Sequence, residues 1–103
     1  MKLKNKIALI TGSSSGIGQG VAKLFAQEGA TVVVNYPNQE EAENANTTLG
    51  LIAGVSPRSI THMANVSAEN EVIEMVNNVK DEFGTIDILV NNAGIATSAP
   101  IHE

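Results

Sequence analysis

Short apolar runs recur along the chain, and each is bounded by glycine or polar residues. A short run of aliphatic and β-branched residues without alternation is typical of a strand that is buried on both faces. The pattern predicts such strands over residues 6–11, 30–35 and 86–90, and a weaker one over residues 59–66.

Between these runs the apolar residues follow the period of a helix. Two stripes have this spacing: Ile17, Val21, Leu24 and Phe25, and then Val72, Val76, Val79 and Phe83. A glycine follows each stripe, as is common after a helix C-terminus. Asn38 and Glu41 have the spacing of a capping box, which predicts a further helix to about Leu49. Ser67 is the predicted N-cap of the last helix.

The predicted order is therefore strand and helix in strict alternation. Such an order favours the α/β class, with a parallel sheet covered by helices on both faces. Residues 51–59, which include Gly54 and Pro57, are expected to form a loop or a frayed helix end. We find no linker and no repeat beyond this unit, so residues 1–103 are expected to form a single domain or half of a larger one.

Composition excludes several classes of protein. Hydrophobic residues make up 43% of the 103 residues, which excludes a disordered chain. Six Lys+Arg against eleven Asp+Glu give 6 − 11 = −5, a charge that argues against nucleic acid or an anionic membrane as the main partner. Cysteine is absent, and the two histidines leave little for a metal site. The first apolar run is too short for a signal peptide, so we expect a cytoplasmic protein.

The glycine-rich segment after the first predicted strand carries the clearest chemical signal. Gly12, Gly16 and Gly18 lie between that strand and the first helix. A helix N-terminus has unpaired N–H groups and partial positive charge, so a phosphate can bind there if no side chain blocks it. We expect Gly12 to make the turn, Gly16 to let the ligand approach and Gly18 to let the helix lie close to the sheet. We expect hydroxyl groups for hydrogen bonds to phosphate and ribose oxygens from Ser13, Ser14 and Ser15.

Two other interpretations of this segment are open. The glycines can form a flexible turn that binds no ligand. Alternatively, Gly12-Ser13-Ser14-Ser15-Gly16 matches the G-x-S-x-G turn of α/β-hydrolases, with Asp87 and His102 following in the order of a catalytic triad. This turn comes after the first strand, however, so no earlier strand supplies an oxyanion-hole loop.

Two motifs together identify a resemblance. The segment Thr11-Gly12-x3-Gly16-Ile17-Gly18 and the segment Asn91-Asn92-Ala93-Gly94 lie 91 − 12 = 79 residues apart. In this order and at this separation they resemble the short-chain dehydrogenase/reductase family, and in particular its glucose dehydrogenases and 3-oxoacyl-carrier-protein reductases. The resemblance implies a Rossmann-like sheet with partial strand order 3-2-1-4, and an oxidoreductase that transfers hydride between NAD(P)(H) and an alcohol or carbonyl substrate.

The resemblance also implies a cofactor site. It places the pyrophosphate and the adenosine ribose near residues 12–18, the adenine beside Asn65 and Val66, and the nicotinamide ribose near the strand end at 91–94. The residues implied to bind the cofactor are Gly12, Ser13, Ser14, Ser15, Gly16, Ile17, Gly18, Asn35, Tyr36, Asn65, Val66, Asn91, Ala93 and Gly94. The family usually has Asp where this chain has Asn65, whose amide oxygen can still accept a hydrogen bond from the adenine amino group.

The choice between NADP(H) and NAD(H) depends on the end of the second strand. An acidic residue there would bind the ribose 2′-hydroxyl and repel a 2′-phosphate. The chain has Asn35 at this place, which favours NADP(H) slightly. Tyr36 and Pro37 follow without an arginine, and Ser15 stands where some NADP-preferring relatives carry a basic residue.

The catalytic residues of the family do not match any residue of this chain. The family uses a tyrosine as acid/base and a lysine four residues later. The lysine cation lowers the pKa of the tyrosine from its usual value of about 10, so that the tyrosine can act near neutral pH. The chain's one tyrosine is Tyr36, and Glu40 stands four residues later. We therefore expect the N-terminal, cofactor-binding half of a homo-oligomeric dehydrogenase. A non-catalytic nucleotide-binding module is the alternative.

Overall fold

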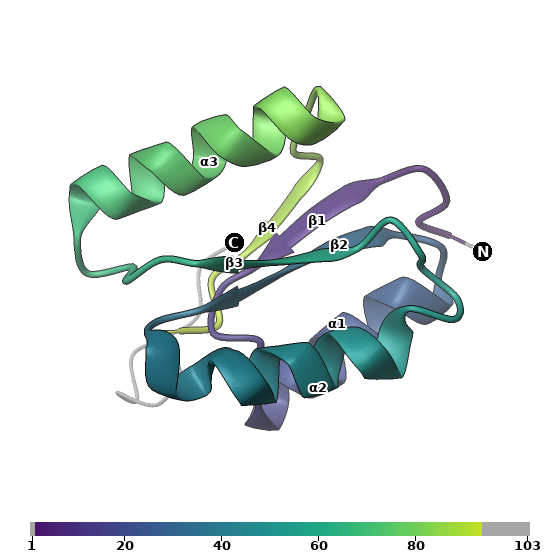
Figure 1. The fold of residues 1–103 in the computed structure, drawn as a ribbon. Helices are drawn as coiled ribbons and strands as arrows, with labels where there is room; N and C mark the ends of the chain where they lie inside the picture. Colours follow the sequence, from purple (N-terminus) through teal and green to yellow (C-terminus); the bar gives the residue numbers. More distant parts are fainter. Residues whose placement is uncertain (1, 94–103) are drawn as a thin grey trace.

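The computed structural model describes residues 2–93, which contain a four-stranded parallel sheet. Its strands are β1 (Ile7–Ile10), β2 (Thr31–Tyr36), β3 (Ile60–Met63) and β4 (Ile88–Val90). They lie in the order β3-β2-β1-β4 (Figure 1). The α/β fold and the strand order 3-2-1-4 are therefore confirmed.

Helices cover both faces of this sheet. Helices α1 (Gly16–Gln27) and α2 (Ala42–Ile52) lie side by side on one face, and α3 (Glu69–Phe83) lies on the other (Figure 1). A single 3₁₀ turn, η1 (Gln39–Glu41), leads into α2. No helix among residues 2–93 combines the length and the apolar character needed to cross a membrane.

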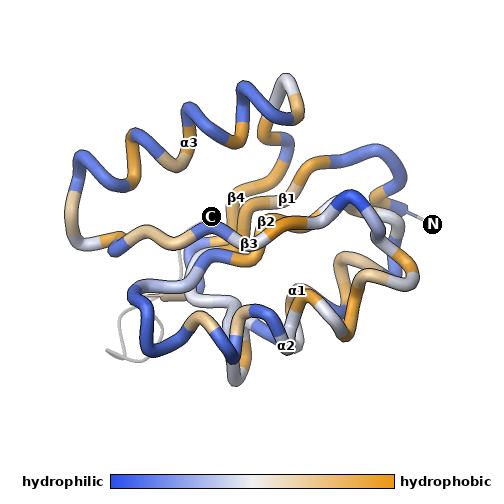
Figure 2. Tube along the Cα trace, in the orientation of Figure 1, coloured by the Kyte–Doolittle hydropathy of each residue, from blue (hydrophilic) through white to orange (hydrophobic). Residues whose placement is uncertain are grey.

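Alternate residues of each central strand enter two different cores. Ala8 and Ile10 of β1 pack toward α1 and α2, whereas Ile7 and Leu9 pack with Met75 and Val79 of α3. The tube in Figure 2 shows the apolar strands between the helices. Burial on both faces explains why the central strands are continuous apolar runs rather than alternating ones.

The buried face of α1 differs from the predicted one. Gly18, Ala22 and Ala26 are buried, whereas Ile17 and Leu24 are 63% and 55% exposed. Of the predicted apolar stripe, Val21 and Phe25 do pack against the core, so the prediction was wrong for Ile17 and Leu24 only. The centre of the contact is formed by small residues because α1 lies close to the strands, so that glycine and alanine fill the space between them.

The structure corrects two further helix predictions. Helix α2 was predicted to end at about Leu49 but continues to Ile52, with Gly50 inside it. The N-cap residue of α3 is Ala68 and not Ser67. The Ser67 hydroxyl donates instead to Oδ1 of Asn65 at 2.6 Å, within a turn that precedes the helix.

Candidate functional site

A pocket of about 630 Å³ opens at the carboxyl ends of the parallel strands. It lies at the end of β1, which stands between β2 and β4 in the sheet. After β1 the chain enters α1 on one face of the sheet, whereas β4 is reached from α3 on the opposite face. Ligands of open α/β sheets bind in such a crevice. The described residues that line it are Gly12, Ser14, Ser15, Ile17, Asn35, Pro37, Asn38, Glu41, Ala64, Asn65, Val66, Ser67, Asn92 and Ala93.

The three glycines of the first turn have distinct structural roles. Gly12 and Gly16 have φ values of +61° and +60°, a region that residues with a Cβ rarely adopt. A Cβ at Gly16 would meet no protein atom within 4 Å, so the space beside this backbone is open. A Cβ at Gly18 would collide with Nδ2 of Asn92 and the carbonyl oxygen of Gly12. Gly18 therefore allows the close approach of α1 to the strand ends.

The three serines of this turn differ in how far their hydroxyl groups are available. Ser13 is fully buried, and its hydroxyl donates to the carbonyl of Ile10 at 2.8 Å. Ser14 is 4% exposed and donates to Oε1 of Glu41 at 3.0 Å. Ser15 is exposed, is the N-cap residue of α1 and makes no side-chain capping bond. Among the three, Ser15 offers the hydroxyl most open to a ligand.

Asn35 at the end of β2 is 1% exposed and holds the glycine turn in place. Its Oδ1 accepts from the backbone N–H of Gly12 at 3.0 Å. Its Nδ2 donates to the carbonyl oxygens of His62 and Ala64 at 3.2 and 3.1 Å. Both ends of the amide are therefore bonded to protein, and the side chain connects three segments at the base of the pocket.

The end of β4 is joined to the same turn. The Thr11 hydroxyl accepts from the N–H of Ala93 at 3.1 Å and lies 3.4 Å from Oδ1 of Asn91. Nδ2 of Asn92 donates to the carbonyl of Gly12 at 2.8 Å, while its Oδ1 is buried without a partner in the described part of the chain. Gly94, the last residue of this predicted motif, lies outside the described residues.

Residues 65–67 form one wall of the pocket. The family resemblance implies that Asn65 lies beside the adenine. Its Oδ1 accepts from the backbone N–H and the hydroxyl of Ser67. The backbone N–H of Asn65 donates to Oε1 of Glu71 at 2.8 Å. Asn65 and Val66 both line the pocket, so their contact with a ligand stays a prediction.

Tertiary structure also brings to the pocket six residues that were not among those implied to bind the cofactor. They are Pro37, Asn38, Glu41, Ala64, Ser67 and Asn92. The capping pair Asn38 and Glu41 was a usable signal, because a helix that begins just after a parallel strand begins at the carboxyl edge. The predicted residues Ser13, Gly16, Gly18, Tyr36 and Asn91 are not in the lining; Tyr36 packs beside the α1–α2 core.

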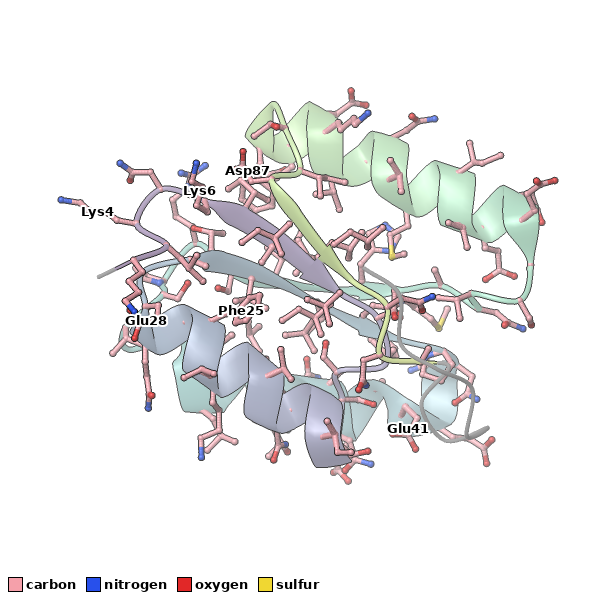
Figure 3. All side chains as sticks on the ribbon, turned by 180° about the vertical axis from the view of Figure 1, so that it is seen from behind. Lys4, Lys6, Phe25, Glu28, Glu41 and Asp87 are labelled. Atoms are coloured by element: carbon pink, nitrogen blue, oxygen red, sulfur yellow. The ribbon has the colours of Figure 1, made fainter. Side chains whose placement is uncertain are left out.

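The structure does not assemble a hydrolase triad. Oδ2 of Asp87 accepts from the backbone N–H of Ile7 at the amino end of β1, whereas Ser14 follows the carboxyl end of the same strand. Figure 3 shows Asp87 and Glu41 at opposite ends of the molecule. His102 lies outside the described residues. Among residues 2–93 no group of three or more His, Asp or Glu side chains could hold a metal ion.

Comparison with known proteins agrees with this geometry. Residues 6–103 match the family model described as short chain dehydrogenase. The chain is 41% identical to a 3-oxoacyl-(acyl-carrier-protein) reductase of Thermotoga maritima over 96% of its own length and 39% of the relative's. It is 42% identical to a galactitol 2-dehydrogenase of Agrobacterium fabrum over 99% of its length and 38% of the relative's. The chain thus spans about two fifths of these curated relatives.

Solved structures give the same result. A short chain dehydrogenase from Burkholderia cenocepacia in complex with NADP superposes with a TM-score of 0.82 and 37% identity, over 88% of this chain and 36% of the other. A Serratia marcescens short-chain dehydrogenase/reductase mutant also gives 0.82, with 29% identity over 89% and 37%. The parallel sheet, the glycine turn, the family model and the relatives all agree. This chain therefore belongs to the short-chain dehydrogenase/reductase family of oxidoreductases.

Proposed function

We propose that residues 1–103 bind a nicotinamide dinucleotide across the carboxyl edge of the sheet. The observation that carries the proposal is the pocket itself, which is bounded by the glycine turn before α1 and by the segments after β2, β3 and β4. Open space beside Gly16 and the unpaired N–H groups of the α1 N-terminus suit a pyrophosphate.

The rest of the pocket suits the adenosine half of the cofactor. The adenosine ribose lies between the glycine turn and residues 37–41, and the adenine lies against residues 64–67. Ala93 and Asn92 border the pocket on the β4 side, from which the dinucleotide extends toward the nicotinamide. The NADP complex of the Burkholderia relative supports this class of cofactor.

In the proposed reaction the cofactor supplies hydride transfer to or from an alcohol or carbonyl carbon. The role of residues 1–103 is to bind and orient the dinucleotide. The sequence contains one tyrosine, with Glu40 four residues later, so we assign the acid/base groups to residues beyond these 103 in a longer oligomeric enzyme. The alternative is a module that binds the nucleotide without turnover.

Calorimetric titration of the chain with NAD⁺, NADP⁺, ADP and adenosine tests the binding proposal. We expect the dinucleotides and ADP to bind more tightly than adenosine, because the helix N-terminus interacts with the phosphates. Equal affinity for ADP and adenosine would contradict a phosphate site. A hydride-transfer assay on a protein that contains this chain and the Tyr-x-x-x-Lys segment separates the enzyme from the non-catalytic module.

A further inference from the structure

Glu41 is the one charged side chain among the described residues that line the pocket. It ends the 3₁₀ turn η1, where Oδ1 of Asn38 accepts from its backbone N–H at 3.2 Å. This cap fixes the backbone of Glu41 beside the glycine turn. The residue lies at the end of the molecule opposite Lys4 and Lys6 (Figure 3).

Neighbouring side chains hold the Glu41 carboxylate against the pocket wall. Its Oε1 accepts from the Ser14 hydroxyl at 3.0 Å and from Nδ2 of Asn44 at 3.3 Å. The second carboxylate oxygen receives no hydrogen bond from residues 2–93. A carboxylate held in this way is an acceptor for a neutral hydroxyl group and repels an anion.

Cations that would offset this charge are not found in the pocket. The chain has six Lys and Arg residues, all within the described part, and none of them lines the pocket. A ribose 2′-phosphate carries close to two negative charges and needs cationic or strong neutral donors. Here it would meet one fixed carboxylate, with no Lys or Arg beside it.

From this arrangement we infer that Glu41 determines the cofactor preference, so that the site takes the 2′-hydroxyl of NAD(H) and disfavours the 2′-phosphate of NADP(H). The inference rests on the proposed function. It runs against the slight NADP(H) preference predicted from Asn35. That prediction considered the strand end alone, and Asn35 is buried with its amide bonded to protein. The acidic group at the ribose comes instead from the turn that begins the next helix.

A minimal pair of probes tests the inference on the full 103-residue chain. Adenosine 5′-monophosphate and adenosine 2′,5′-bisphosphate differ only in the 2′-phosphate, and NAD⁺ and NADP⁺ form the matching dinucleotide pair. We expect the unphosphorylated member of each pair to bind about tenfold more tightly or better. In Glu41→Gln the amide oxygen still accepts from Ser14, but the negative charge is gone. The ratio of the two affinities, unphosphorylated to 2′-phosphorylated probe, should therefore fall toward one. Glu41→Lys should reverse it.

Glu40→Gln is the matched control, because Glu40 is exposed, adjacent and absent from the pocket lining. It removes the same charge from the same turn and should leave the ratio unchanged. Thermal unfolding of each variant checks that the fold is retained. Equal affinity of the wild-type chain for both members of a pair would overturn the inference, as would an equal shift in Glu40→Gln. Failure of every probe to bind would instead remove the proposed function, and the inference with it.

Discussion

The backbone N–H of Gly12 donates to Oδ1 of Asn35 across 3.0 Å, although the two residues are 23 positions apart. Parallel pairing of β1 and β2 brings the two strand ends together, with Ile10 opposite Val34. The contact joins the turn that begins α1 to the strand that precedes η1. A buried amide thus holds this part of the pocket wall in place.

Asn35→Asp should destabilise the fold by about 3 kcal/mol. The substitution replaces the Nδ2 donor with an oxygen that faces the carbonyls of His62 and Ala64, in a site with 1% exposure. Urea denaturation measures the loss. Asn46→Asp makes the same chemical change on the exposed side of α2 and should be nearly neutral. Similar losses in both variants would show that the buried contacts contribute little.

Gly18→Ala and Gly20→Ala should have opposite effects on stability, although both lie in α1. The new Cβ at position 18 would press on Asn92 and Gly12, at a cost of about 1–3 kcal/mol. At position 20 it meets nothing within 4 Å, and alanine should stabilise the helix by about 1 kcal/mol. Thermal unfolding distinguishes them. A Gly18→Ala variant as stable as the wild type would mean that the strand end moves away without cost.

Gly16→Ala should weaken NAD⁺ binding by about tenfold or more, the equivalent of about 1.4 kcal/mol. The Cβ would occupy the open space beside the helix N-terminus where we propose that the pyrophosphate binds. Gly84→Ala is the control, because Gly84 also has a positive φ, of +85°, and open space around it. Both variants should lose about 1–2 kcal/mol of stability through backbone strain. Only Gly16→Ala should change the calorimetric affinity; an equal change in both would assign the effect to strain.

Ser59→Ala should cost about 1–3 kcal/mol. The Ser59 hydroxyl accepts from the backbone N–H of Val32 at 2.9 Å and lies 2.6 Å from the Ser56 hydroxyl in a buried site. Alanine would leave that N–H without an acceptor in the core. Ser67→Ala, which removes an exposed hydroxyl, should change the urea midpoint little. Equal urea midpoints for the two variants would mean that the backbone N–H of Val32 finds another acceptor when the Ser59 hydroxyl is removed.

The sequence by itself determined the class of fold and the position of the glycine turn. Continuous apolar runs and helical spacing are local properties, so they indicated the four strands and the three helices correctly. The motif from Thr11 to Gly18, together with the motif that begins at Asn91, indicated the family by resemblance, and the family model confirms it. Even the cap formed by Asn38 was visible in the spacing of two residues.

Only the tertiary structure decided which side chains face the pocket. Spacing along one helix could not show that α1 packs through Gly18, Ala22 and Ala26, because the close approach depends on the strands beneath it. The sequence likewise did not show that Asn35 is a buried side chain that connects three segments, or that Glu41 is the charged residue of the pocket lining. Their partners come from segments distant in sequence. Parallel strand pairing brings those segments to one edge, and the strand pattern does not show which side chains then meet there.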